Sequence, residues 1–466
     1  MDNNKKRKQM MRIALTESVM VVAVVVIVAL LMFMVMGYSL RTGDEWSVEQ
    51  SGLVQLVSEP SGASIQIDGE DIFPRTETSR MISAGEHTVR LYRDGYTDWQ
   101  KQINVRSGIF LRLKYPRLFK DNRGAETAKT LENIEWVRFS DNRRYLLYAI
   151  KDSKVWNLVD LDSNELKEIK TDTTGIIDGT LKNLEWLSNN EKVLVEITKE
   201  NTREWRIIDL KTPEKSVNLT EMFGMNFESI SPLNEAGDRF WVIENGNLRQ
   251  IYISNKEASS VIASNVLSFA NDKDEVVYVK KTPDDERAIE TYRDGDSKGV
   301  KVMDITDNSL SVKVAVEEYL GDTYLSLLLS QKFIGYKADD FPVVGQDFAM
   351  EKYLEQDLKM APETFKASKN RQFVIMNNGK NMGVMDAETE QIYEYELASD
   401  KYFWVDDYLI GEVVEGELVV YDFDGTNRRD LTKASSGYPA LINGNNRWLY
   451  YFRTDDEKLL LKREQL

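Results

Sequence analysis

The chain has 466 residues, a net charge of −17, no cysteine and a single histidine, His87. Residues 1–37 carry five basic and two acidic side chains, so the rest of the chain has a net charge of −20. An acidic body disfavours nucleic acid as a partner, because nucleic acid requires a basic face. One histidine excludes a His-rich metal site. A body of more than 400 residues is too long for one compact core, so we expect at least two domains.

The N-terminus has the pattern of a membrane anchor. A basic segment, residues 1–12, precedes Ile13–Gly37, in which the eighteen residues Val19–Met36 carry no charge. At about 1.5 Å per residue, the run from Ile13 spans a hydrocarbon core of about 30 Å. A buried core helix is rarely apolar on every face. A cleaved signal peptide has a shorter apolar region and a small-x-small cleavage site, which is missing here. We therefore predict a transmembrane helix at 13–37.

The distribution of charge around this helix predicts its orientation. The cations lie before the helix, whereas the far side begins with Arg41, Asp44 and Glu45. By the positive-inside bias, residues 1–12 form a cytoplasmic tail and the C-terminal body lies outside the cytoplasm. Residues 38–52 are predicted to be a juxtamembrane linker, with Trp46 as an interfacial anchor. The predicted location is the cell membrane, with a single pass through the lipid bilayer.

The segment Leu53–Tyr115 alternates short β-type runs with glycine-containing turns, which predicts a small β-sandwich at 53–115. Glycine supplies the positive φ that tight turns between antiparallel strands require. The predicted strands are Val54–Val57, Ser64–Asp68, His87–Tyr92, Trp99–Val105 and Ile109–Lys114.

The same segment resembles the PEGA domain family. The resemblance rests on Pro60-Ser61-Gly62-Ala63, Ile67-Asp68-Gly69, Ala84-Gly85-Glu86-His87-Thr88-Val89, Gly95-Tyr96 and Trp99, in the family's order and spacing. The middle turn departs from the family, since Phe73-Pro74-Arg75-Thr76 stands where Gly-x-Thr-Pro is usual. The resemblance implies a surface or envelope module that binds protein or polysaccharide and has no catalytic activity. His87 is interpreted as a strand residue.

The remainder, 131–466, repeats one strand pattern. The pattern starts at positions 143, 191, 238, 274, 370, 406 and 446, with spacings of 36 to 48 residues except for one gap of 96. Because 96 is twice 48, an eighth copy is expected near the middle of that gap, at Asp322–Leu329. A period of this length is typical of propeller blades with four strands each. We predict a β-propeller of eight blades, with seven as the alternative.

A second strand follows most copies and ends in an aspartate after two apolar residues. These aspartates are predicted to hydrogen-bond the following turn, with metal ligation as the minority interpretation. They are Asp160, Asp209, Asp304, Asp386 and Asp422.

The repeat units resemble TolB-like or WD40-like blades. Phe139-Ser140-Asp141-Asn142 is similar to a degraded Ser-Pro-Asp-Gly turn, and Tyr421-Asp422-Phe423-Asp424-Gly425 resembles the family's strand-end motif. The last unit, Tyr438–Leu466, has room for only three strands. We therefore predict that residues 116–130 are either a linker or a ring-closing strand, and that part of Arg117–Leu131 supplies the fourth strand.

No catalytic, cofactor or metal site is predicted from the motifs. The segment Asp422–Asn427 is superficially similar to a calcium loop, but it lacks a third ligand before the glycine and a later glutamate. Asp294-Gly295-Asp296 is interpreted as a turn. Trp136 and Trp186 are predicted to occupy equivalent places, since each follows a glutamate and precedes the repeated strand, and this repetition indicates a place in the blade core.

The sequence thus predicts an all-β extracellular body, a PEGA-type β-sandwich plus a propeller, on one transmembrane helix. The favoured function is a non-enzymatic, membrane-anchored surface protein that binds an envelope protein or polysaccharide. One alternative is a propeller glycosidase or lyase acting on envelope glycans. Another is a subunit of a transmembrane sensing or assembly complex. No nucleic acid, cofactor or metal is expected.

Overall fold

The computed structural model describes residues 16–28, 32, 38–42, 46–163, 165–187, 190–200, 202–234, 236–342, 344–345, 349–455 and 458–466. The chain divides into two compact units, Met1–Asn122 and Arg123–Leu466. Residues 16–28 are helical, whereas the basic tail 1–12 and half of the predicted transmembrane segment 13–37 lie outside the described residues. Within the described part of the chain, no helix combines the length and the apolar character needed to cross a bilayer.

The first unit contains two four-stranded sheets. Buried side chains from both sheets, including Val54, Val89 and Trp99, form its core. Trp99 also packs edge-on against Tyr115, with ring centroids 5.8 Å apart. One sheet consists of β1 (Tyr38–Thr42), β2 (Trp46–Leu56), β5 (Thr78–Ser83) and β8 (Phe110–Leu113), and the other of β4 (Glu70–Ile72), β3 (Ser64–Ile67), β6 (Gly85–Tyr92) and β7 (Trp99–Val105).

Three features of this unit differ from the sequence prediction. The predicted linker 38–52 is instead an antiparallel hairpin of β1 and β2. Strands β4 and β5 were not predicted. Strand β8 lies parallel to β2 rather than antiparallel to β7. The turn before β8 approaches β2, because Gly108 N donates to Ser51 O at 2.9 Å. Gly52 permits this approach, since a Cβ there would lie 2.6 Å from the Arg106 carbonyl oxygen.

The unusual middle turn of this unit is held by Thr76, which is 6% exposed. Its hydroxyl accepts a hydrogen bond from Ala63 N at 2.9 Å and lies 2.6 Å from Ser58 Oγ. Thr76 N donates to Ala63 O, and Gly62 N donates to Thr76 O. Thr76 therefore links this turn to two neighbouring segments through both its side chain and its main chain.

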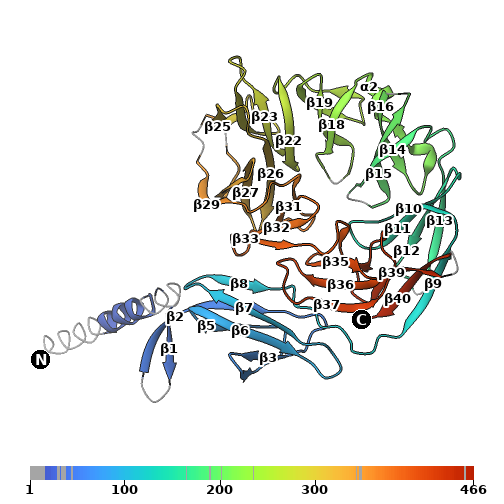
Figure 1. Cartoon of the computed structure of the whole chain (residues 1–466). Helices are drawn as coiled ribbons and strands as arrows, with labels where there is room; N and C mark the ends of the chain where they lie inside the picture. The colour runs from blue at the N-terminus through green and yellow to red at the C-terminus, as the bar shows by residue number, and fades with distance from the viewer. Residues whose placement is uncertain are drawn as a thin grey trace, which may run out of the picture. The chain divides into compact units, whose positions relative to one another are not determined.

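The second unit contains eight four-stranded antiparallel sheets in its described residues, arranged as the blades of a propeller (Figure 1). The predicted number of eight is thus confirmed. First strands of neighbouring blades contact one another, as β22 and β26 do, so the first strand of each blade lies nearest the ring axis. The copy predicted in the 96-residue gap is β27, with the predicted bounds Asp322–Leu329.

The strands of blades 1 to 4 follow one another along the chain. Blade 1 has β10 (Ile134–Phe139), β11 (Tyr145–Ile150), β12 (Val155–Asp160) and β13 (Lys167–Asp172). Blade 2 has β14 (Thr180–Trp186), β15 (Lys192–Lys199), β16 (Thr202–Asp209) and β17 (Val217–Asn218). Blade 3 has β18 (Phe227–Pro232), β19 (Arg239–Glu244), β20 (Asn247–Tyr252) and β21 (Glu257–Ala258). Blade 4 has β22 (Val266–Asp272), β23 (Glu275–Lys281), β24 (Arg287–Arg293) and β25 (Val300–Ile305).

Blades 5 to 7 continue in the same order, and blade 8 uses a strand from the start of the unit. Blade 5 has β26 (Val312–Tyr319), β27, β28 (Lys332–Ala338) and β29 (Glu351–Asp357). Blade 6 has β30 (Thr364–Ala367), β31 (Phe373–Asn377), β32 (Asn381–Asp386) and β33 (Gln391–Glu396). Blade 7 has β34 (Tyr402–Trp404), β35 (Leu409–Val414), β36 (Glu417–Asp422) and β37 (Arg429–Lys433). Blade 8 has β38 (Leu441–Ile442), β39 (Trp448–Asp455), β40 (Lys458–Gln465) and β9 (Ala125–Leu131).

The repeated strand of the sequence is the second strand of each blade, and it is apolar on both faces because it is buried between two neighbouring blades. In β11, for example, five of six residues are buried. Apolar clusters join blades 1 and 2, 2 and 3, 3 and 4, 4 and 5, 5 and 6, and 8 and 1. Phe373 and Phe423 join blades 6 and 7, with ring centroids 4.4 Å apart, and Ile442 N donates to Val405 O between blades 7 and 8.

Strand β9 closes this ring. It pairs with β40 from Leu131 opposite Leu459 to Ala125 opposite Glu464, and so forms the outer strand of blade 8. Leu131 is 2% exposed in the cluster between blades 8 and 1. Arg123, just before β9, adds a buried ion pair of 3.0 Å with Glu464. The segment before the first repeat therefore supplies the strand that the last unit lacks.

Replacing β9, residues 125–131, by a Gly/Ser segment of equal length should markedly lower the melting temperature. Removing the buried Leu131 alone costs about 2–5 kcal/mol, which corresponds to a fall of roughly 3–7 °C for a unit that spans residues 123–466. Thermal melting followed by circular dichroism measures the change. An unaltered melting curve would show that β9 does not hold the ring closed.

Candidate functional site

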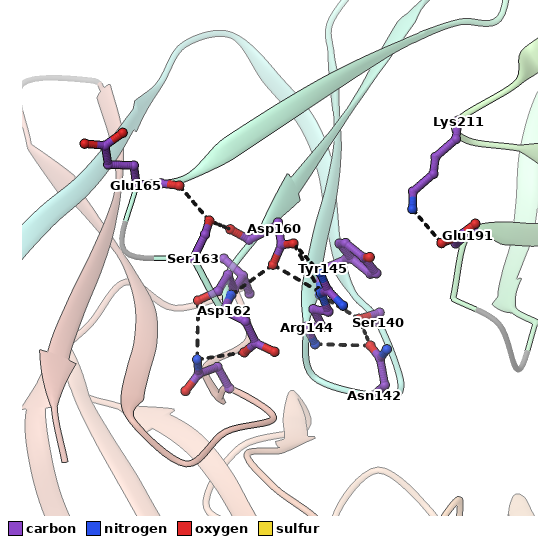
Figure 2. Close-up of polar contacts among 12 residues, drawn as sticks. Ser140, Asn142, Arg144, Tyr145, Asp160, Asp162, Ser163, Glu165, Glu191 and Lys211 are labelled. Atoms are coloured by element: carbon purple, nitrogen blue, oxygen red, sulfur yellow. Dashed lines mark hydrogen bonds and ion pairs between the residues drawn. The ribbon is translucent and has the colours of Figure 1, made fainter.

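The strand-end aspartates are used to build turns, as Figure 2 shows for blade 1. Asp160 Oδ1 accepts a hydrogen bond from Asp162 N at 3.0 Å, and Asp160 Oδ2 pairs with the Arg144 guanidinium at 2.7 Å. Partial burial alone would raise the pKa of Asp160, but Arg144 and the Asp162 amide lower it below its ordinary value. Burial and the neighbouring Asp160 instead raise the pKa of Asp162. Asp160 is therefore an ionised turn residue.

Equivalent aspartates act in the same way in other blades. Asp209 Oδ1 accepts hydrogen bonds from the amides of Lys211 and Thr212, at 3.1 and 2.7 Å. Asp386 Oδ1 accepts from Glu388 N at 3.0 Å. Asp422 Oδ2 accepts from the side-chain amide of Asn427 at 2.9 Å.

Asp304 was placed in this group wrongly. It lies in β25, the outer strand of blade 4, whereas the third strand of that blade is β24. Its carboxylate pairs with Lys301 at 2.7 Å. Arg293 occupies the position that aspartate holds in blades 1 and 2, at the end of the third strand. The sequence comparison skipped β24 because Arg287–Arg293 lacks the terminal aspartate that was used as the marker.

The carboxylate oxygens considered for metal ligation already have hydrogen-bond or ion-pair partners. Asp424 Oδ1 accepts from both the amide and the hydroxyl of Thr426, at 3.1 and 2.7 Å. Asp294 Oδ1 accepts from Gln250 Nε2 at 2.9 Å, and its other oxygen pairs with Arg239. Among the described residues, no group of three or more His, Asp or Glu side chains is placed to hold a metal ion.

Trp136 and Trp186 share one core but not one position. Trp186 is opposite Val193 at the last pair before the turn of blade 2, whereas Trp136 is opposite Ala149, further from the turn of blade 1. Both side chains nevertheless pack into the cluster between blades 1 and 2. Both tryptophans are core residues, as predicted. Their positions are not equivalent, because the Glu-Trp pair lies at a different point in the strand register of each blade.

His87 lies in β6 and contacts two other residues of the first unit. Its Nδ1 is 2.6 Å from Asp68 Oδ2, and its Nε2 is 2.8 Å from Ser83 O and 3.2 Å from Ser83 Oγ. The bond from Thr88 N, followed by the contact with His87, lowers the pKa of Asp68. The grouping has the composition of a hydrolase triad. The carboxylate can only accept, so Nδ1 donates to Asp68, and Nε2 faces both the carbonyl oxygen and the hydroxyl of Ser83.

Charged side chains meet across the ring axis. The Nζ atom of Lys369, in the first turn of blade 6, is 3.1 Å from Asp141 of blade 1 and 3.4 Å from Glu185 of blade 2. Arg143 of blade 1 pairs with Asp407 of blade 7 at 3.0 Å. A propeller glycosidase would be expected to have acidic residues that converge near the axis. Here the Lys369 ammonium forms an ion pair with both carboxylates and offsets one of their two negative charges.

A cavity of about 600 Å³ lies at the junction of blades 2 and 3. One wall is the start of β16, with Thr202 and Arg203, and the other is the segment Gly224–Asn226 that follows α2 (Leu219–Phe223). The Arg203 guanidinium spans the two blades, since it pairs with Glu196 at 2.9 Å and donates to Glu228 O at 2.8 Å. This cavity is the candidate functional site.

The sequence analysis missed this site, although one local signal was present. Asn218 and Glu221 have the spacing of a capping box, and Asn218 Oδ1 accepts from Glu221 N at 3.2 Å. This cap starts α2 where blades 1 and 4 continue their outer strands. The resulting cavity depends on two blades meeting, which a repeat alignment does not show.

The second unit is therefore a β-propeller, and a smaller unit of two sheets precedes it in the chain. Residues 51–117 match the family model described as PEGA domain, which confirms the resemblance predicted for 53–115. No curated protein sequence matches the chain.

Solved structures with propeller-containing folds are similar to this chain at low identity. Porphyromonas gingivalis dipeptidyl peptidase 4 is 10% identical, with 72% of this chain and 58% of that chain covered and a TM-score of 0.47. An oligogalacturonate lyase in complex with manganese is 10% identical, covering 72% and 97%, with a TM-score of 0.42. Citrobacter koseri AztD is 9% identical, covering 76% and 92%, with a TM-score of 0.39. These similarities supply no argument about function.

One buried carboxyl lies outside all these features. Glu317 of β26 is 1% exposed, and neither of its carboxyl oxygens has a hydrogen-bond partner among the described residues. Burial raises the pKa of Glu317 well above its ordinary value, and the neighbouring carboxylates of Asp272 and Asp386 raise it further. Folding therefore favours the protonated, neutral form of the Glu317 carboxyl.

Glu317→Gln should remove a pH-dependent loss of stability. The folded chain keeps a proton that the unfolded chain releases above about pH 4.3, so wild-type stability falls as the pH rises from there toward the raised pKa. The variant should melt about 2–4 °C or more above wild type at pH 8, and the gap should close near pH 4. Melting curves across this range test it, with Glu318→Gln, an exposed neighbour, as control. A difference in melting temperature that does not change with pH would contradict the raised pKa of Glu317.

Proposed function

We propose that this chain is a membrane-anchored cell-surface or envelope protein whose propeller is a non-enzymatic binding platform. The anchor is the apolar segment 13–37, and the bound partner is an envelope protein or polysaccharide. The N-terminus is cytoplasmic and the body lies outside the cytoplasm. In this arrangement the PEGA domain separates the anchor from the propeller and is itself a binding module.

The observation that carries the proposal is the cavity between blades 2 and 3. Its volume of about 600 Å³ lies within the range of about 300–1,000 Å³ typical of ligand sites. It is lined by hydroxyl, amide and guanidinium groups from Thr202, Asn226 and Arg203, together with the partly buried Met225. These groups bind by hydrogen bonding and contact, and none is arranged as a nucleophile with a base.

Catalysis and signalling remain the alternative functions. A glycosidase or lyase requires carboxylates that are free to act on a glycosidic bond, whereas Asp141 and Glu185 are paired with Lys369. A sensing or assembly role would require a partner that binds through the transmembrane segment. The experiments below separate these functions.

A pull-down from cell envelopes tests the platform. The full chain, solubilised in mild detergent and immobilised, should retain a protein or a glycan that excess soluble protein displaces. Bound proteins and bound glycans are scored separately, and release of shortened glycans is measured in the same sample. If circular dichroism shows that the chain is folded and it retains nothing, the proposed function as a binding platform is wrong. Glycan cleavage would favour the enzyme.

The absence of cysteine gives a direct test of topology. Asn3→Cys and Glu86→Cys each introduce one thiol, the first before the anchor and the second at an exposed position of the PEGA domain. In intact cells, a membrane-impermeant maleimide should label the variant at position 86 and spare the variant at position 3. Both should react after detergent lysis. The reverse pattern, or equal labelling in intact cells, would overturn the proposed orientation.

A further inference from the structure

The cavity between blades 2 and 3 borders an incomplete sheet edge. In blade 2 the outer strand β17 has two residues, whereas β13 and β25, the outer strands of blades 1 and 4, have six each. Strand β16 has eight residues, but β17 pairs with only Arg206 and Ile207. Among the described residues, no other strand pairs with this edge of β16. The beginning of β16 is therefore an edge without a neighbouring strand.

Side chains cover most of the remaining edge. Asp209 N donates to Ser216 Oγ at 3.0 Å, and Trp205 N donates to Thr220 Oγ1 at 2.9 Å. The backbone groups of residues 205 and 209 therefore point outward, away from β15. Because direction alternates along a strand, Arg203 has the same orientation, and its N–H and C=O point into the cavity that it lines.

Blade 3 shows how a short outer strand is otherwise compensated. Its β21 also has two residues. There, however, the following chain covers β20, because Leu248 N donates to Ala263 O, Ile262 N to Leu248 O and Ser259 N to Gln250 O, at 2.8–3.0 Å. In blade 2 the corresponding chain forms α2 and leaves the edge at Arg203 open to the cavity.

We propose that this cavity binds an extended peptide segment of a partner protein, which adds a short strand to β16 at Arg203. An exposed strand edge offers main-chain donors and acceptors at the spacing that an extended peptide matches. Opposite the edge, Met225 and Asn226 contact the peptide's side chains. Among the described lining residues, the aromatic side chain is that of Phe227, which is 1% exposed and presents no open ring face to a sugar.

This inference rests on the proposed function and specifies its partner as a polypeptide. The discriminating variant is Arg203→Pro, which removes the outward N–H. Proline is tolerated at an edge position whose N–H faces away from the sheet. Arg203→Ala is the matched control, because it removes the same side chain and keeps the N–H. Asn226→Trp is a second test variant, which fills the cavity from the opposite wall and leaves β16 unchanged.

The probe is a library of displayed linear twelve-residue peptides, selected on the full-length chain in detergent. Selected peptides should bind Arg203→Pro at least tenfold more weakly than Arg203→Ala, since the two variants lack the same side chain and differ in the main-chain N–H. They should bind Asn226→Trp at least tenfold more weakly than wild type. N-methylation of the peptide at alternate positions should abolish binding, since it removes main-chain donors. Melting curves verify that each variant is folded. Should Arg203→Pro not fold, the comparison of Asn226→Trp with wild type decides the result.

Two outcomes would overturn the inference. One is a selection that yields no peptides, and the other is peptides that bind all four proteins alike. The envelope pull-down distinguishes this failure from failure of the proposed function. A partner retained equally by wild type and Asn226→Trp leaves the platform intact and moves the site elsewhere. If a glycan is retained and no peptide binds, the platform function also stands and the peptide site is wrong. If no partner at all is retained, the proposed function itself fails.

Discussion

The pairing of β9 with β40 is the constraint on which the rest of the propeller depends. A blade has two faces, and each becomes apolar core only when another blade covers it, so an open arc of blades would expose one apolar face at each end. Residues 125–131 and 458–465 are separated by more than 300 residues in the chain, yet together they complete blade 8. The resulting contact buries Leu131, Leu459 and Leu461 against blade 1. Arg123 and Glu464 add an ion pair that is almost inaccessible to solvent.

In the closed ring, polar side chains near the turns stabilise the turns and the contacts between blades. Asp160, Asp209 and Asp386 fix the turns after the third strands, and Lys369 links blades on opposite sides of the axis. Exposed ion pairs of this kind contribute about 0–1 kcal/mol each, so their main effect is to set local geometry. A chain with 77 acidic residues thereby uses many of them for architecture rather than for binding or catalysis.

The proposed site lies where one blade departs from the repeat. Blades 1 and 4 complete their sheets with outer strands of six residues, and blade 3 covers its short edge with the following chain. Blade 2 instead forms the five-residue helix α2, which satisfies Trp205 N through Thr220 and leaves Arg203 beside a cavity. A local loss of strand pairing thus converts part of a repeated scaffold into a surface that accepts another chain.

The sequence by itself determined the elements whose signal is local. Alternating runs and glycine turns predicted β3, β6 and β7. The apolar runs predicted all eight second strands, and the period located β27 inside the gap. A strand buried between two blades must be apolar on both faces, so its identity can be read from the residues alone. The turn-forming role of Asp160 and Asp209 could also be predicted from the residues next to them, because each accepts a hydrogen bond from an amide two positions later.

Apart from the closing strand β9, which the incomplete last unit predicted, only the tertiary structure decided how distant segments combine. The parallel pairing of β8 with β2, the hairpin at 38–42 and 46–56, and the different registers of Trp136 and Trp186 all depend on which strands become neighbours. Pairing partners far apart in the chain leave no periodic signal, because hydrogen bonds between strands involve the main chain, which is the same for every residue. The cavity at Arg203 has the same origin, since it exists only where β16 and the segment after α2 meet.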